Sequence, residues 1–327
     1  DIFGFEHYKI NKAMMSSSQS AMTQASKKIE PFRIRQAMVA LELGSTDNKI
    51  LEYLDFLTAQ VPTGSAYFLH VLPRFDVLSH IVEREGGSTV SNYEVNDEVA
   101  HRMQREIRAR MDHHDGLHVQ FDVKEGDPLE QLLEDAEDVN AELTVIGQKS
   151  GTDKHGILGK NLARKTKGNT LIIPDQAKVQ MKRIIVPIDF SKNSIKALRT
   201  AIALNESLGE PAKITVLNIF EMPNLSVYKI QRTREQFERM LQKDHEEAMN
   251  AFLNTQVPDY RDQLETKLIM QKTPGIAQYI MDVAEEHEGD FIVMGAKGHS
   301  KVELLLLGSV TEKLLGLNEH IPTLIVK

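Results

Sequence analysis

The sequence contains no cysteine and no tryptophan, and aromatic residues make up only 6% of its 327 residues. Without cysteine the chain has neither disulfide bonds nor thiolate chemistry, which fits a reducing compartment and predicts a cytoplasmic protein. No apolar run approaches the roughly 20 residues of a membrane-spanning helix, so we expect no membrane segment. The net charge of -8 argues against broad binding to nucleic acid or anionic membranes, because such binding needs a basic surface.

The residues that are present, 41% hydrophobic and 26% charged, are typical of a globular protein of about two domains. The first residues, Asp1 to Phe5, lack an initiator methionine and a basic leader with an apolar centre. We interpret them as a trimmed or partial start and not as an intact signal peptide. Residues 1–33 show no lasting hydrophobic period, so we expect a partly mobile N-terminal extension with room for a short docked helix.

From Ile34 onward, short apolar runs alternate with segments whose apolar residues recur every three to four positions, which predicts alternating strands and helices. The expected strands are residues 36–42, 66–71, 119–123, 142–146, 170–173, 183–188, 213–220, 264–270, 290–294 and 323–326. The expected helices are residues 47–60, 95–113, a segment from Pro128, and residues 194–208, 228–253, 274–286 and 310–317. This alternation predicts parallel strands with helices on both faces.

The pattern repeats once along the chain. Leu143-Thr-Val-Ile-Gly147 matches Phe291-Ile-Val-Met-Gly295 at an offset of about 148 residues, and other strands match at similar offsets. We therefore predict two copies of one domain, residues 34–175 and 181–327, joined by a linker around Pro174 to Met181.

A glycine-bearing segment, Gly295-Ala-Lys-Gly298 followed by Gly308-Ser309, lies between an expected strand and an expected helix. A strand, a glycine loop and a helix start form a common phosphate site, because unpaired N–H groups and the helix dipole attract an anion. An alternative stays open: Ser309 to Glu312 has the pattern of a capping box, and the glycines then only form a turn.

Together with the strand Arg183-Ile-Ile-Val-Pro-Ile-Asp189-Phe-Ser191, the spacing Gly-x2-Gly-x9-Gly-Ser resembles the ATP-binding pattern of the universal stress protein family. The resemblance covers residues 34–327 and is to the tandem, two-domain type. It implies an α/β fold of two Rossmann-like domains, of the adenine nucleotide alpha hydrolase-like type. Each domain would hold a five-stranded parallel sheet of order 3-2-1-4-5 flanked by helices. Ligands bind such sheets where the strand order reverses, which here means beside Asp189 and Gly295.

The resemblance implies that Asp189 faces the adenosine, that two apolar side chains enclose the base, and that the glycine loop surrounds ribose and phosphates. The nucleotide-binding residues that it implies are Pro187, Asp189, Ile219, Met294, Gly295, Gly298, Gly308, Ser309 and Val310. Two alternatives remain, helix capping for Asp189 and plain core packing for Ile219 and Met294. The expected cofactor is ATP, with Mg²⁺ as an option.

The first copy departs from this pattern. Glu42 stands in place of the aspartate, Ser150 in place of the second glycine, and Lys160 in place of the phosphate-facing serine, in a shorter loop. We expect this half to have lost nucleotide binding or to bind differently, with Lys160 as a point charge for phosphate as the other possibility.

No further motif predicts catalysis. Gly-x-Ser-x-Gly and His-Glu-x-x-His are absent, so no catalytic residue is assigned. The segment Asp112-His-His-Asp-Gly-Leu-His118 is interpreted as a solvated helix end, and no metal site is predicted, because no partner cluster stands at a recognised spacing.

We expect a stress-response regulatory protein that binds ATP, or another adenine nucleotide, in its C-terminal domain as a conformational or partner-binding switch. The alternatives are a slow ATPase or autophosphorylating protein, and a nucleotide-free interaction module. The expected partners are an adenine nucleotide and a second copy of the chain, without nucleic acid or membrane. Because family members associate through their last strands, residues 170–173 and 323–326 are expected to pair.

Overall fold

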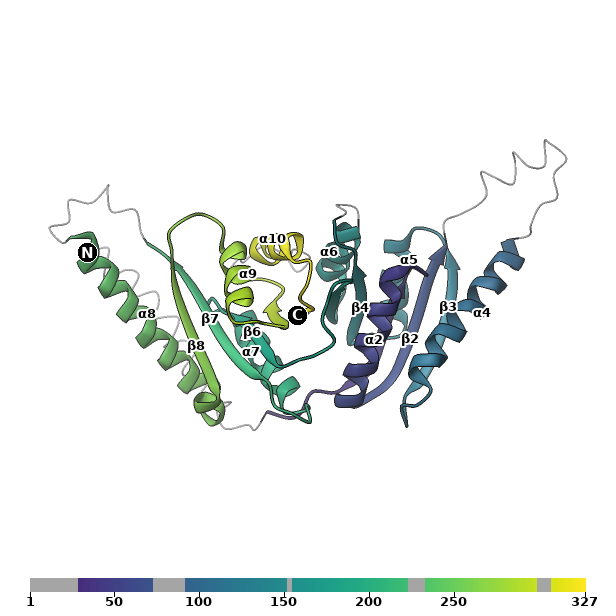
Figure 1. The fold of residues 1–327 in the computed structure, drawn as a ribbon, viewed down its shortest axis with the longest axis horizontal. Helices are drawn as coiled ribbons and strands as arrows, with labels where there is room; N and C mark the ends of the chain where they lie inside the picture. Colours follow the sequence, from purple (N-terminus) through teal and green to yellow (C-terminus); the bar gives the residue numbers. More distant parts are fainter. Residues whose placement is uncertain (1–28, 73–91, 152–154, 223–232, 299–306) are drawn as a thin grey trace.

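The computed structural model describes residues 29–72, 92–151, 155–222, 233–298 and 307–327 (Figure 1). The first half contains β1 (Ile34–Leu41), α2 (Ser45–Gln60), β2 (Thr63–Leu72), α4 (Asn92–Met111), β3 (His118–Glu125), α5 (Pro128–Asp138), β4 (Leu143–Gln148), α6 (His155–Lys165) and β5 (Asn169–Pro174). The second contains β6 (Arg183–Pro187), α7 (Lys192–Asn205), β7 (Lys213–Glu221), α8 (Arg234–Gln256), η2 (Pro258–Gln263), β8 (Leu264–Gln271), α9 (Ile276–Glu286), β9 (Phe291–Gly295), α10 (Ser309–Leu317) and β10 (Thr323–Val326).

Within the described residues the strands form one ten-stranded sheet, in the order β3-β2-β1-β4-β5-β10-β9-β6-β7-β8. Neighbouring strands are parallel within each half, and β5 pairs antiparallel with β10, with Leu171 opposite Leu324. This confirms the predicted α/β fold with a mainly parallel sheet and the predicted pairing of the last strands. Figure 1 shows the two halves side by side, with β3 and β8 at the outer edges.

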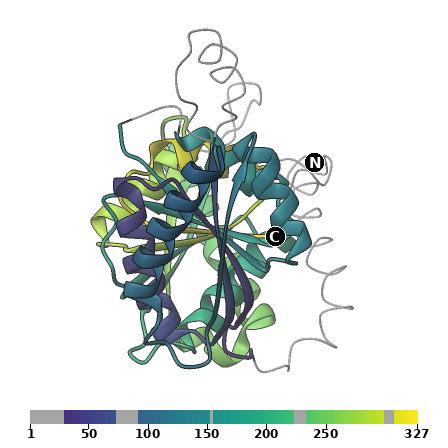
Figure 2. The same ribbon diagram turned by 90° about the vertical axis from the view of Figure 1, so that its right-hand side faces the viewer.

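Each face of the sheet carries its own hydrophobic core. Along β1, Ala37, Val39 and Leu41 point to one face, while Met38 and Ala40 point to the other, as the two-residue period of a strand requires. The first face is covered by α2, α4, α7 and α8, and the second by α5, α6, α9 and α10. Figure 2 shows helices on both sides of the strands. Strands covered on both sides explain why the sequence contains continuous apolar runs in place of alternating ones.

Capping residues and a first-turn proline mark the start of α5 where the sequence predicts it. Asp127 caps α5 by accepting a hydrogen bond from the Glu130 N–H at 2.9 Å, and Pro128 occupies the first turn, where no N–H is needed. Backbone positions with positive φ also recur in the two halves: Leu43 matches Phe190, and Asn140 matches Glu288.

Two expectations need correction. Residues 155–165 form α6, whereas the sequence pattern predicts a loop that includes Lys160. The predicted helix 228–253 is observed as α8 from Arg234, and its first expected residues lie outside the described part. Of the N-terminal extension only residues 29–33 are described. The Phe32 N–H donates to the Ala203 carbonyl of α7 at 2.8 Å, so the end of the extension lies against the second half.

The halves also meet through aromatic side chains. Tyr53 of α2 stacks on Phe291 of β9, with ring centroids 6.3 Å apart and an interplanar angle of 8°, and both side chains are fully buried. Among the described helices none is long and apolar enough to cross a membrane.

Replacing Phe291 by Ala should lower the free energy of unfolding by about 3–5 kcal/mol, because it removes a fully buried ring at the junction of the halves. Urea unfolding followed by circular dichroism measures this. Leu317→Ala, at a side chain with 48% of its surface exposed, is the control and should change the free energy by about 0.5 kcal/mol or less. Equal effects of the two substitutions would contradict the expected core role of Phe291.

Candidate functional site

The carboxyl ends of β6 and β9 lie beside each other at the candidate site. The two strands are neighbours in parallel register, with Ile184 opposite Phe291. Pro187 is the last residue of β6 and Gly295 the last residue of β9. A Cβ added to Gly298 would overlap the Asp189 carboxylate. The structure therefore brings the predicted aspartate against the predicted glycine loop, although more than a hundred residues separate them in the sequence.

Asp189 stabilises the turn between β6 and α7. Its Oδ1 accepts a hydrogen bond from the Ser191 N–H at 3.0 Å, next to Phe190, which has a φ of 62°. The cap of α7 is Ser191, whose hydroxyl oxygen accepts from the Ser194 N–H at 3.2 Å. The alternative that Asp189 caps α7 is therefore wrong, because the N-cap residue is Ser191. The Asp189 carboxylate lies two residues earlier and stabilises the turn before the helix.

Backbone hydrogen bonds fix both ends of the glycine loop. The Gly308 N–H donates to the Ala296 carbonyl at 2.7 Å, and the Ala296 N–H donates to the Val326 carbonyl at 2.8 Å. The Thr311 hydroxyl donates to the Gly295 carbonyl at 3.1 Å, which ties the first turn of α10 to the end of β9. Residues 299–306 of the predicted motif lie outside the described part. Sequence reasoning gave Thr311 no role, since a threonine in a first helical turn is common.

The N-terminus of α10 faces the loop without a side-chain cap. Gly308 is the N-cap residue, and no side chain of the described residues caps the helix. Ser309 is exposed and is the first residue inside the helix. The capping-box alternative is therefore wrong, because Ser309 stands one position too late to cap. Within the described part of the chain the first N–H groups of α10 have no side-chain cap, an arrangement that suits water or an anion.

Ile219 and Met294 lie on the same face of the sheet as α9 and α10. Met294 is buried, with 5% of its surface exposed, whereas Ile219 and Val310 are half-buried. Met294 therefore belongs to the core, as the alternative interpretation holds. The half-buried Ile219 and Val310 have surface available for a ligand on this face.

Gly295 allows β9 to approach α7 closely. A Cβ at this position would lie 3.0 Å from three atoms of Asn193, in the first turn of α7. At the equivalent strand end of the first half, a Cβ on Gly147 would collide with the side chains of Thr46 and Ile50 of α2. Both glycines are thus required by packing between helix and strand, whatever ligand binds nearby.

The first half ends its fourth strand in a different way. Only residues 149–154 separate β4 from α6, whereas residues 296–308 separate β9 from α10. Lys160 lies inside α6, and its Nζ would be 3.1 Å from a Cβ added to Gly316 of α10. The assignment of Lys160 to the phosphate-facing position is therefore wrong, because the helix begins before it and turns its ammonium group towards α10.

In the first half, N–H groups of the loop after β4 donate hydrogen bonds to carboxylates of the same chain. The Ser150 N–H and hydroxyl both donate to Oδ1 of Asp175, at 3.2 and 2.5 Å. The Gly151 N–H donates to Oε1 of Glu319, which follows α10 in the second half, at 3.3 Å. The N–H groups of Ser150 and Gly151 therefore already have carboxylate acceptors within the chain.

A further carboxylate is buried at the end of β1. The Glu42 and Leu43 N–H groups donate to the two oxygens of Asp47, at 3.1 and 2.6 Å. Burial raises the pKa of Asp47 to about 6, the charges of Glu42 and Glu106 act in the same direction, and the two hydrogen bonds oppose the shift. Negative charge at this strand end disfavours a nucleotide phosphate.

Asp47 should therefore titrate with a midpoint of about 6 in the folded protein, which the pH dependence of its carboxyl ¹³C signal measures. Since the ordinary pKa is 3.8, the folded state takes up this proton first, so acidification from pH 7 to pH 4 favours folding at this site. Relative to Asp47→Asn, the wild-type free energy of unfolding should rise over this range by about 3 kcal/mol at most. A midpoint near 3.8, or a relative stability that falls on acidification, would contradict this.

Comparison with known proteins agrees with this architecture. Residues 181–327 match the model of the universal stress protein family. The chain is similar to two universal stress proteins of Methanocaldococcus jannaschii. It is 30% identical to the first over 162 residues, which cover 46% of this chain and 96% of that relative. It is 27% identical to the second over 147 residues, which cover 45% of this chain and 82% of that relative. The crystal structure of a universal stress protein from Archaeoglobus fulgidus superposes on this structure with a TM-score of 0.57 and a sequence identity of 18%. The superposition covers 89% of this chain and 96% of that protein, which shows a similar fold. Since the more similar relative is matched over nearly its whole length, the chain belongs to the universal stress protein family.

Proposed function

We propose that this chain is a cytoplasmic stress-response regulatory protein whose second half binds one adenine nucleotide, ATP in the first instance, as a switch. The observation that carries the proposal is the N-terminus of α10. No side chain of the described residues caps it, and its N-cap residue Gly308 lies beside residues 296–298, which follow β9 and contact Asp189 at the end of β6. The proposed units are residues 34–175 and 181–327, and the nucleotide belongs to the second.

The geometry supports separate places for the two ends of the nucleotide. Phosphates would lie against the first N–H groups of α10 and the exposed Ser309, with a Mg²⁺ ion on the phosphates as an option. The half-buried Ile219 offers apolar contact to the base, and the Asp189 carboxylate offers acceptors to the adenosine. An apolar wall with a few polar groups is the usual composition of such sites.

The first half is proposed not to bind nucleotide. Its loop is short, and carboxylates of Asp175 and Glu319 already accept from the loop N–H groups. An added phosphate would have to displace one negative charge and approach others, including buried Asp47. We therefore expect one nucleotide for each chain.

Contacts of α10 support the proposed role as a switch. Arg164 of α6 forms an ion pair with Glu312 of α10 at 3.1 Å. The Gln148 side-chain amide donates to the Leu315 and Asn318 carbonyls, at 3.2 and 2.9 Å. A ligand at the N-terminus of α10 would thus act on a helix that contacts the first half. We also propose, from the family resemblance, that two chains associate. A ligand-induced change in α10 would then act on the second chain as well as on the first half.

Calorimetric titration of the full-length chain with ATP should give one site per chain. Asp189→Ala should weaken binding by about tenfold or more, equivalent to about 1.4 kcal/mol, because it removes the carboxylate at the strand end and loosens its turn. The matched substitution in the first half, Glu42→Ala, should leave ATP binding unchanged.

Ser309→Ala tests the phosphate end more gently, since Ser309 is exposed and its loss leaves the core intact. It should weaken ATP more than adenosine. A flat titration with folded wild-type protein would select the nucleotide-free interaction module instead. Equal effects of Asp189→Ala and Glu42→Ala would place the bound nucleotide elsewhere.

A further inference from the structure

Near the amino ends of β1 and β2, Asp55 meets two histidines, His113 and His114, that lie more than fifty residues later in the sequence. Asp55 lies on α2, while His113 and His114 follow the last residue of α4. Nε2 of His113 is 2.9 Å from Oδ1 of Asp55, and Nε2 of His114 is 2.7 Å from the same oxygen. One ligand atom from each residue lies within 4.8 Å of the others.

The turn after α4 places both imidazole rings on the same side of the chain. Consecutive residues of a helix point about 100° apart, but the helix has already ended here. The His114 N–H donates to the Met111 carbonyl at 3.1 Å, and Gly116 has a φ of 81°, which closes the turn. The ring centroids of His113 and His114 are consequently only 4.2 Å apart. Met111 is fully buried and anchors the turn.

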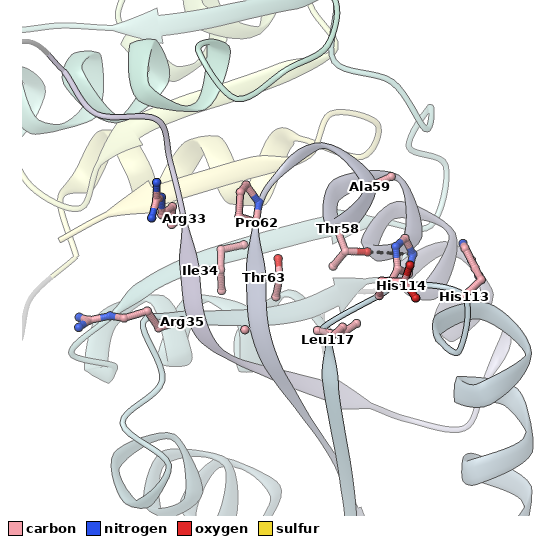
Figure 3. A pocket seen from close by; sticks show the side chains of 12 residues that line it. Arg33, Ile34, Arg35, Thr58, Ala59, Pro62, Thr63, His113, His114 and Leu117 are labelled. Atoms are coloured by element: carbon pink, nitrogen blue, oxygen red, sulfur yellow. Dashed lines mark hydrogen bonds between the residues drawn. The ribbon is translucent and has the colours of Figure 1, made fainter.

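The burial of the three side chains suits an accessible but ordered site. The His114 side chain has 10% of its surface exposed, Asp55 34% and His113 62%. Thr58, one turn beyond Asp55 on α2, has its hydroxyl 3.1 Å from Nε2 of His114 (Figure 3). Without an ion, these contacts hold His114 and Asp55 in place. Both use Nε2 of His114, so a bound ion would replace them at that nitrogen, and His113 is reachable from solvent.

The three ligand atoms lie close enough together for one small divalent ion to bind all of them after a small outward shift. Ligands bound to zinc in a tetrahedral site at 2.0–2.1 Å lie about 3.3 Å from one another. The two observed N···O distances, 2.9 and 2.7 Å, are those of hydrogen bonds and are shorter than this value by about 0.4 and 0.6 Å, so the side chains would have to move apart slightly to admit an ion. Two imidazoles and one carboxylate form a frequent protein ligand set for zinc, with water in the fourth position.

Space for that fourth ligand exists beside the cluster. A cavity of about 580 Å³ lies at the amino ends of β1 and β2, and both histidines line it together with Arg33, Arg35 and Thr63 (Figure 3). Arg35 is paired with Glu142, and Asp115 also lines the cavity, so the wall carries charges of both signs and water is the expected fourth ligand. This cavity lies at the amino ends of the strands, whereas the nucleotide site is proposed at carboxyl ends.

We propose that Asp55, His113 and His114 form a binding site for a zinc-like transition-metal ion, which joins α2 to the turn before β3. No metal is predicted here from the sequence, because no partner cluster stands at a recognised spacing, and Asp55 lies more than fifty residues before the histidines. The site is independent of the nucleotide proposal, since it uses other residues at the opposite ends of the strands.

The test uses full-length protein stripped with a chelator and then titrated with Zn²⁺ against a chromophoric competitor. Wild-type protein should bind one Zn²⁺ per chain through this site. Asp55→Asn, which keeps the shape of the side chain, and His113→Ala should each weaken binding by at least about tenfold. His118→Ala is the matched control, because His118 begins β3 just beyond the turn and is not part of the cluster.

Circular dichroism verifies that each variant is folded, and His113→Ala is the safest variant because its side chain is largely exposed. Co²⁺ in place of Zn²⁺ adds a second readout, since its visible absorption reports nitrogen and oxygen ligands and should disappear in Asp55→Asn. Absence of Zn²⁺ binding by wild-type protein would overturn the proposal. So would binding that Asp55→Asn and His113→Ala leave unchanged, because the three side chains would then only bond to one another.

Discussion

The antiparallel pairing of β5 with β10 is the constraint on which the rest of the architecture depends. Thr170, Leu171, Leu324 and Ile325 in these strands are all at most 2% exposed. In a separated half, such a strand would present an apolar edge to water, and exposed edges of this kind pair with other chains. Joining the two last strands removes both edges at once. It also sets α6 against α10, so the ends of the two halves share one region of the molecule.

The same order of elements produces two different strand ends. In the second half the Gly308 N–H donates to the Ala296 carbonyl just after β9, and no side chain among the described residues caps the start of α10. In the first half α6 begins early, and carboxylates from Asp175 and from Glu319 of the other half fill the loop donors. A carboxylate and a phosphate use the same N–H groups, so occupation by one excludes the other. This physical competition explains why one half is proposed to bind nucleotide and the other to support it.

Sequence reasoning failed where a helix start carries no clear signal. Comparison with the glycine loop of the second copy placed Lys160 in a loop, and the glycines at 156 and 159, which lower helix propensity, gave no sign of a helix there. The structure shows that α6 is nevertheless formed, and Leu162 and Ala163 in it are fully buried against the sheet. Burial of apolar side chains outweighs the cost of two glycines, at about 1 kcal/mol each. Lys160 consequently lies in this helix and contacts α10, and it is not a phosphate ligand of a loop.

The sequence by itself determined the alternating α/β pattern, the repeat, the meeting of Asp189 with the glycine loop, and the pairing of the last strands. The alternating pattern and the repeat follow from the hydrophobic period, which is a local property. The meeting of Asp189 with the glycine loop and the pairing of the last strands were implied by the resemblance to the universal stress protein family, which supplied the strand order. Only the tertiary structure decided which loop donors are already occupied, that Gly295 serves packing against Asn193, and that Asp55 meets His113 and His114. Such contacts depend on how separate elements approach within a few ångströms, and no spacing along one chain encodes that distance.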